Sequence, residues 1–233
     1  MSIRTGSCMI FPMNKLFPIL LILMAFSACT PAANTPSPTS PATPTTGVLS
    51  SPTAPGTALI PTQIIPCVLT PVVAPTPAKD PGYTQLDETT GLHVTGTAKE
   101  IDLASYRLKV TGLVDHPLNL TYDELRCMPR VTDHPVLVCQ GYFEDVANWT
   151  GVPLKYVLDM AGVQAGAKKV ILTAADGYST TLQLVDALLP GNFLAYELEG
   201  KPVPVLHGFP LRAVIPSMKG YAWVKWLVEM RVE

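Results

Sequence analysis

From residue 83 to the C-terminus, short apolar runs recur, and several of them alternate with polar residues. The last run is the clearest: every second residue from Val224 to Val232 is apolar, whereas on the other face only Leu227 is. A period of two residues is typical of a half-buried strand. The same reasoning predicts further strands at residues 107–114, 136–139, 169–173, 179–184, 193–198 and 211–215.

Helix signals in this region are few and short. Thr121 followed by Glu124 is typical of a capping box and predicts a helix over residues 122–126. Pro153 fits the first position of a helix that runs to Met160, with Gly162 just past its end, and residues 185–189 are predicted to form one more turn. Many strands with interspersed short helices predict a β-rich α+β domain and not a doubly wound sheet.

The N-terminus has a different pattern. Lys15 precedes an uncharged run, residues 16–26, which ends in Ser-Ala-Cys29. A basic start, a short apolar run and small residues before a cleavage point are typical of a secretory signal. The run is about eleven residues long, too short to span a hydrocarbon core of ~30 Å. Small residues directly before a cysteine resemble a bacterial lipobox, so we expect residues 1–29 to be a lipoprotein signal peptide.

In that interpretation Cys29 carries a lipid, and the protein is extracytoplasmic and anchored to the membrane. A plain signal peptide that leaves Cys29 as a free thiol is the alternative. Translation starts at Met1 or at Met13, and the second start gives a signal of ordinary length.

Residues 30–82 are rich in Pro, Thr, Ser and Ala and carry almost no charge. Such a segment cannot bury enough apolar area to offset the entropy lost on ordering. It is therefore predicted to be a disordered linker, which leaves residues 83–233 as the folded domain. The more apolar stretch 60–73 is expected either to lie on the domain as an edge strand or to remain part of the linker.

Charge and cysteine content narrow the classes of function. A net charge of −2 with 15% charged residues gives no electrostatic case for nucleic acid or for an anionic membrane surface. Export to an oxidising compartment would permit disulfides. Three cysteines follow Cys29, namely Cys67, Cys127 and Cys139. Since a disulfide takes two, at least one of the three is not in a disulfide with the others. The pairings Cys67–Cys127 and Cys127–Cys139 both stay open.

Generic catalytic signatures are absent from the sequence. It contains no G-x-S-x-G, H-E-x-x-H, P-loop or G-x-G-x-x-G motif, and no C-x-x-C-H motif for covalent haem. What remains is Cys139 at the end of a predicted strand, where a thiolate suits a transition metal, although a buried free cysteine is the structural alternative. Arg212 could bind a phosphate or a carboxylate with its planar fork. Lys225 lies opposite the apolar stripe of the last strand, as an ordinary solvated lysine would.

Taken in order, several segments resemble the molybdopterin-binding domain of the sulfite oxidase family. The match runs from about Ile101 to Glu233. It includes Val-Cys-Gln-Gly at 138–141, His-Gly-Phe-Pro-Leu-Arg at 207–212 and Val-Lys-Trp-Leu at 224–227. The other matching segments are 106–113, 120–125, 149–154, 176–178 and 194–196.

The resemblance implies a sulfite-oxidase-type fold with mixed sheets and a bound molybdenum cofactor. It assigns Cys139 as the ligand of molybdenum and places Cys139, Arg212 and Tyr178 at the reacting centre. It further implies that His207, Arg212 and Lys225 contact the pterin and that Asp176 borders the site together with Tyr178.

The activity that the resemblance implies is oxygen-atom transfer to or from a small oxo-compound. The electrons would be exchanged with a separate redox partner, because this chain has no haem motif. Larger members have an Asn-bearing N-terminal stretch that reaches the pterin, and the region before Ile101 offers no match to it. The alternative is a cofactor-free binding or interaction lipoprotein that reuses the fold. It is motivated by the signal, since exported molybdopterin proteins usually carry a twin-arginine signal and this N-terminus has only Arg4 and Lys15.

Overall fold

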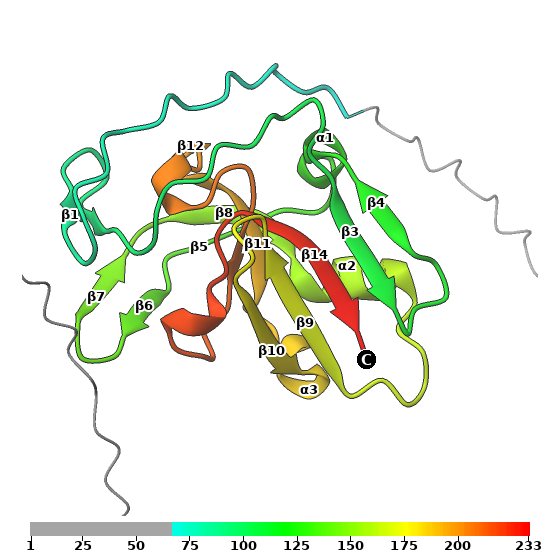
Figure 1. The fold of residues 1–233 in the computed structure, drawn as a ribbon. Helices are drawn as coiled ribbons and strands as arrows, with labels where there is room; N and C mark the ends of the chain where they lie inside the picture. Colours follow the sequence, from blue (N-terminus) through cyan, green and yellow to red (C-terminus); the bar gives the residue numbers. More distant parts are fainter. Residues whose placement is uncertain (1–66) are drawn as a thin grey trace, which may run out of the picture. The chain divides into compact units, whose positions relative to one another are not determined.

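Two five-stranded sheets form the centre of residues 67–233, the part of the chain that the computed structural model describes (Figure 1). The predicted signal peptide, the lipidation site Cys29 and residues 30–66 of the predicted linker lie outside the described residues. Within residues 67–233, no helix is long and apolar enough to cross a bilayer.

The first sheet has the order β10-β9-β14-β3-β4. Its strands are β3 (Leu108–Gly112), β4 (Leu118–Leu120), β9 (Lys169–Ala174), β10 (Ser179–Gln183) and β14 (Leu227–Val232). β14 pairs in parallel with β3 and antiparallel with β9, so the sheet is mixed. Burial alternates strictly along β9, which is the two-residue period that the sequence predicts.

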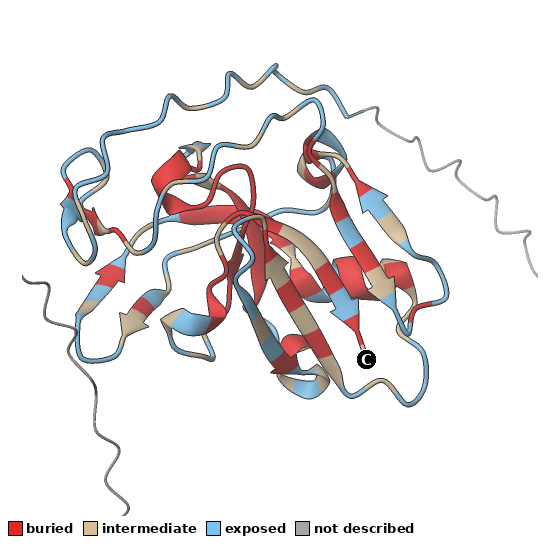
Figure 2. Cartoon of the chain, in the orientation of Figure 1, coloured by how far each residue is buried: buried red, intermediate tan, exposed pale blue. Residues whose placement is uncertain are grey.

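The second sheet has the order β12-β11-β8-β5, and β13 also pairs with β11. Its strands are β5 (Val131–Asp133), β8 (Trp149–Pro153), β11 (Phe193–Leu198), β12 (Lys201–Pro202) and β13 (Arg212–Val214). β8 and β11 are buried along nearly their whole length, as the red segments of Figure 2 show, and they form the middle of the core.

Two hairpins and a few short helices complete the fold. The hairpins are β1–β2 (Leu86–Asp87 and Leu92–His93) and β6–β7 (Val136–Cys139 and Phe143–Val146). The helices are α1 (Tyr122–Arg126), α2 (Leu154–Ala161) and α3 (Leu184–Ala187), with the 3-10 turns η1 (Val205–His207) and η2 (Gly220–Ala222). The prediction of a β-rich α+β domain with mixed sheets and a few short helices is confirmed.

The capping box of α1 is confirmed in detail. Thr121 Oγ1 accepts a hydrogen bond from the Glu124 backbone N–H at 3.1 Å, and the Glu124 carboxylate accepts one from the Thr121 backbone N–H at 2.7 Å. α2 ends at Gly162 with φ 68°, as the glycine predicts, while Pro153 occupies the N-cap and not the first helical position.

The predicted alternation of the last strand is confirmed at Met230, Arg231 and Val232 and fails at Leu227 and Val228. β14 begins only at Leu227, and its pairing with β9 shifts register between Leu227 and Glu229. A bulge of this kind locally disturbs the alternation of inward and outward side chains. Leu227, predicted on the polar face, is therefore fully buried, whereas Val228 is only half-buried.

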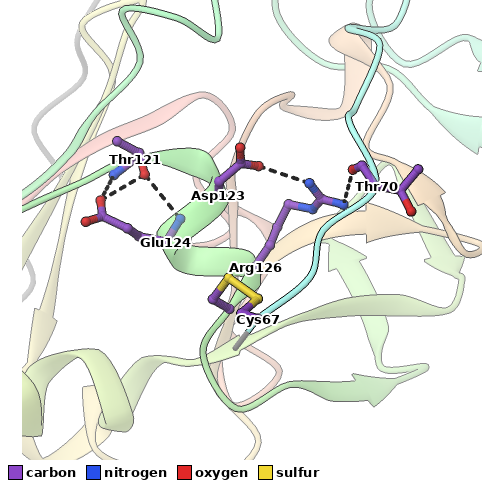
Figure 3. Close-up of a disulfide and its surroundings, with 7 residues drawn as sticks. Cys67, Thr70, Thr121, Asp123, Glu124 and Arg126 are labelled. Carbon is purple, nitrogen blue, oxygen red and sulfur yellow. Dashed lines mark hydrogen bonds and ion pairs between the residues drawn. A yellow bond between two sulfur atoms is a disulfide. The ribbon is translucent and has the colours of Figure 1, made fainter. Parts of the chain in front are cut away.

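The disulfide joins Cys67 to Cys127, at the end of α1, so the Cys127–Cys139 pairing is wrong (Figure 3). Arg126 donates to Thr70 O at 3.1 Å and to Asp123 Oδ1 at 3.0 Å, which fixes the segment after Cys67 against the helix. Residues 67–73 form no strand, so this part of the apolar stretch 60–73 is not an edge strand.

Candidate functional site

A pocket of about 380 Å³ lies where the end of β6, the β9–β10 turn and the segment before β14 meet. Four of the residues singled out in the sequence line it, namely Cys139, Asp176, Tyr178 and Lys225. Its remaining lining residues are Tyr83, Thr95, Gly96, Ala174, Gly220, Tyr221, Trp223, Val224 and Trp226. The structure thus brings together side chains that are spread over more than half of the described chain.

Cys139 is the free cysteine of the three that the structure describes, and it is half-buried. It ends β6 and pairs with Phe143 across the hairpin, so its position is set by the turn between the two strands. Burial, and then the negative charge of Asp145, raise the pKa of the Cys139 thiol. The protein alone therefore favours the protonated thiol, and a bound cation is needed to hold the thiolate.

Lys225 does not project from the solvated face of a strand. It precedes β14, and its ammonium donates hydrogen bonds to Leu206 O at 2.8 Å and to Thr95 O. The same ammonium lies 4.7 Å from the ring centroid of Trp226. Burial, and then the charge of Arg212, lower the pKa of Lys225 to about 7.

Arg212, at the start of β13, is 5% exposed. Its Nη1 donates to His207 O at 3.1 Å, and its guanidinium carbon lies 4.9 Å from the Trp149 ring centroid and 5.8 Å from that of Trp223. Its Nε is buried and has no partner among the described residues. Burial lowers the pKa of Arg212 to about 10, and the charge of Asp145 opposes that shift.

Neither Lys225 nor Arg212 forms an ion pair with a carboxylate of residues 67–233. A cation held away from water without an anion is costly, by several kcal/mol for a fully buried ion. An anionic group bound next to these two cations would offset this cost, so the region favours an anionic ligand.

His207 lies next to this region but does not line the pocket. It is 1% exposed, and its Nε2 is 3.0 Å from Asp87 Oδ2 and 2.9 Å from Thr90 Oγ1. Burial, and then the charge of Arg212, lower the pKa of His207 to about 4, so the ring is neutral at pH 7.

A second, nearly closed cavity of about 10 Å³, room for about one water, lies between His207 and Arg212. The structure therefore separates the predicted residues into a pocket group and a buried group. The residues that line this cavity are Leu92, His93, Leu137, Asp145, Ala147, Trp149, His207 and Arg212.

Gly208 lies between Lys225 of the pocket group and Arg212 of the buried group. Its φ of 116° is one that side-chain-bearing residues rarely adopt, and a Cβ at this position would lie 3.0 Å from Lys225 Cα and 3.3 Å from Arg212 Cβ. The glycine of the His-Gly-Phe-Pro-Leu-Arg segment is thus what allows the backbone to pass between the two cations.

Asp176 and Tyr178 shape one wall of the pocket. Asp176 Oδ1 accepts from the Tyr178 backbone N–H at 2.9 Å, within the β9–β10 turn. The Tyr178 hydroxyl donates to Tyr221 O at 2.7 Å and so ties this turn to η2. The hydroxyl is therefore engaged by the backbone of the facing wall.

Sequence reasoning missed the contribution of the region before Ile101. Thr95 and Gly96 line the pocket, and Asp87 bonds His207. His93 donates its backbone N–H to Asp145 Oδ2 at 2.8 Å, and its Nδ1 lies 2.7 Å from Asp145 Oδ1. The available signal was the Asp-Glu-Thr-Thr-Gly run at 87–91, a turn-forming sequence flanked by Leu86 and Leu92.

The side chains of the described residues could supply only some of the ligands of a metal ion. Among the residues described, no three His, Cys, Asp or Glu side chains come together as a metal site. Cys139 would be one thiolate ligand, and the two unpaired cations suit an anionic group. The residues therefore fit a metal that arrives with an anionic organic cofactor carrying most of its ligands.

Comparison with known proteins points the same way. The model of the "Oxidoreductase molybdopterin binding domain" family matches residues 95–233. The uncharacterized oxidoreductase YuiH of Bacillus subtilis is 37% identical over 127 residues, which cover 54% of this chain and 64% of that protein. The putative protein-methionine-sulfoxide reductase subunit YedZ1 of Azospira oryzae is 33% identical over 129 residues, which cover 55% of this chain and 49% of that protein.

Among solved structures, the sulfane dehydrogenase SoxCD from Paracoccus pantotrophus superposes with a TM-score of 0.55 at 26% identity. The match covers 60% of this chain and 41% of that one. In each of these comparisons the aligned region is less than two thirds of the other protein's length.

Proposed function

This chain belongs to the oxidoreductase molybdopterin-binding domain family, and we propose that it is an exported, lipid-anchored enzyme that transfers an oxygen atom to or from a small oxo-compound. Family membership confirms the resemblance to molybdopterin-binding domains, the type of fold, the oxidoreductase class and the molybdopterin cofactor. The observation that carries the proposal is a pair of neighbouring cations without carboxylate partners among the described residues. One is the half-buried Lys225, which lines the pocket together with the free thiol of Cys139, and the other is the buried Arg212.

The residues of the site divide the work of holding the cofactor. Cys139 would ligate molybdenum through its thiolate, which a metal cation stabilises against the raised thiol pKa. Lys225 and Arg212 would bind the anionic parts of the pterin, and His207 would contact it beside them. When bound, the cofactor supplies two-electron oxygen-atom transfer chemistry.

Lys225 couples binding to a proton. Because its pKa is about 7 in the described structure, roughly half of the ammonium groups are charged at pH 7. An anion placed against the ammonium raises this pKa, so binding of the cofactor would be accompanied by proton uptake at Nζ. Arg212 keeps its charge at neutral pH and needs no such uptake.

The walls of the pocket favour an ordered and partly dry site. Trp223 and Trp226 are almost fully buried behind it, and the Tyr178–Tyr221 hydrogen bond fixes two walls against each other. Asp176 holds the turn that carries Tyr178. These residues would exclude water from one side of a bound substrate, which would enter from the side lined by the exposed Tyr83, Tyr178 and Tyr221.

A separate protein would exchange the electrons, since the sequence has no haem motif. The lipid on Cys29 and the linker 30–82 would keep the domain close to a partner at the membrane. The name of YedZ1 refers to a methionine sulfoxide and that of SoxCD to sulfane, which supports sulfoxides as the first substrates to try.

Metal analysis tests the proposal. Protein expressed with its own signal, through its natural export route, is expected to contain close to stoichiometric molybdenum, and Cys139→Ser is expected to lose most of it. Wild-type metal content in Cys139→Ser would contradict the assigned ligand. A natural-route protein without molybdenum, without pterin fluorescence after denaturation and with an alkylatable Cys139 would instead support the cofactor-free binding lipoprotein.

A further inference from the structure

The β1–β2 hairpin, which precedes the region matched by the family model, places a carboxylate on His207. Asp87 is 5% exposed, and its two oxygens are fully engaged. Oδ1 accepts from the Thr89 backbone N–H at 3.0 Å and from Thr89 Oγ1 at 2.5 Å. Oδ2 accepts from Thr90 Oγ1 at 2.9 Å and faces His207 Nε2 at 3.0 Å.

These contacts fix where the ring proton of His207 lies. A carboxylate can only accept, so the nitrogen that faces Asp87 Oδ2 at 3.0 Å carries the hydrogen. Thr90 cannot reverse this, because its single hydroxyl hydrogen is directed to Asp87 and its oxygen already accepts from the Leu92 backbone N–H at 3.3 Å. In the neutral ring the other nitrogen, Nδ1, is then an acceptor.

Nδ1 of His207 makes no hydrogen bond to any of the residues the structure describes, although the ring is 1% exposed. The hairpin and the residues that follow it are also hydrogen-bonded to other residues around the site. His93 is bonded twice to Asp145, and Thr95 O accepts from Lys225. The hairpin and Thr95, which follows it, therefore contact the residues around the site at three points, through Asp87, His93 and Thr95.

We propose that Asp87 is a positioning residue that keeps the His207 proton on Nε2 and thereby presents Nδ1 as an acceptor to a donor group of the bound pterin. Pterins carry amino and ring N–H donors, which match a lone pair on a neutral imidazole. This inference deepens the proposed function and depends on it for the identity of the ligand. The position of the His207 proton, in contrast, does not depend on the proposed function.

Asp87→Asn is the decisive variant. The Thr89 backbone N–H can only donate, so the amide oxygen of the asparagine must take the place of Oδ1. The amide NH₂ then takes the place of Oδ2 and donates to His207 Nε2, which moves the ring proton to Nδ1. Glu88→Gln is the matched control, because Glu88 is an exposed neighbour on the same hairpin and loses the same charge.

The experiment has two readouts. The first is the ¹⁵N chemical shifts of the His207 ring in cofactor-free protein, assigned with His207→Gln. We expect the proton on Nε2 in wild type and Glu88→Gln, and on Nδ1 in Asp87→Asn. The second is molybdenum and pterin per folded chain after co-expression with cofactor biosynthesis. We expect about tenfold less molybdenum and pterin per folded chain in Asp87→Asn, at the lower end of the loss that follows when the partner of a metal-binding side chain is removed, and unchanged contents in Glu88→Gln.

Three outcomes would overturn the inference: a wild-type proton on Nδ1, a moved proton with unchanged pterin content, or lost content with the proton still on Nε2. The last would mean that Asp87 only supports the fold. A wild-type protein that carries no molybdenum or pterin refutes the proposed function and the choice of ligand. The ¹⁵N shifts of the same cofactor-free protein still decide whether Asp87 sets the proton.

Discussion

Lys225 should make the stability of the cofactor-free protein depend on pH. Its pKa is about 7 in the folded chain and close to its ordinary value of 10.5 when unfolded. Between these values the unfolded state binds more protons than the folded state, so the free energy of unfolding rises with pH. Below pH 7 the full cost of burying the charge is present, and above pH 10.5 it is gone.

The size of the effect follows from the two pKa values. A difference of one between the folded and unfolded pKa values corresponds to about 1.4 kcal/mol. Lys225 alone should therefore add about 2 kcal/mol to the free energy of unfolding between pH 7 and pH 9. Lys225→Met keeps a chain of similar length and removes the titrating group. Its hydrogen bonds to Leu206 O and Thr95 O are lost at every pH, which gives a nearly constant offset.

The assay is urea denaturation of both proteins at pH 7, 8 and 9, with the disulfide intact and without cofactor. The stability of Lys225→Met relative to wild type should fall by about 2 kcal/mol as the pH rises from 7 to 9. Lys219→Met, which removes an exposed lysine of the same segment, is the control for net charge and should change stability by less than about 0.5 kcal/mol. A difference between wild type and Lys225→Met that stays constant over this range would refute the reasoning.

Two further predictions concern the covalent and steric framework. Cys67→Ser together with Cys127→Ser should lower the free energy of unfolding by about 4 kcal/mol, because the bridge spans 60 residues; equal urea midpoints of this variant and of oxidised wild type would contradict it. Gly208→Ala should cost about 1–3 kcal/mol, since the new Cβ would press on Lys225 and Arg212 at a φ of 116°. Molybdenum per folded chain should fall with it, whereas Gly166→Ala, at φ 99° with open space around it, should affect stability alone.

Local signals predicted the fold where the pattern and the pairing agree. The strands 136–139 and 193–198 match β6 and β11 residue for residue, and the cap of α1 follows from Thr121 and Glu124. β8 was missed because Gly151 and Pro153 are usually turn residues. In the structure a Cβ at position 151 would lie 2.0 Å from Leu194 O, so the glycine is what permits this strand to pair. The bulge in β14 depends on its pairing with β9 and leaves no local signal.

The residues of the site, like the strands, could be predicted from the sequence only in part. The family motifs led to Cys139, Asp176, Tyr178 and Lys225, which line one pocket. The β1–β2 hairpin could not be predicted, because each of its strands has two residues and its position depends on distant partners. Asp87 is 120 residues from His207, and His93 is 52 residues from Asp145. Only the folded structure shows that this segment belongs to the site.

The Cys67–Cys127 bridge also determines how mechanical force would travel through the molecule. Any pull on the chain before Cys67 passes through the sulfur atoms into the end of α1 and from there into the core. Residues 68–96, which lead to the β1–β2 hairpin, lie in parallel with this path and carry little of the load. A pull applied before Cys67 should therefore leave residues 68–96, and with them the β1–β2 hairpin, in place.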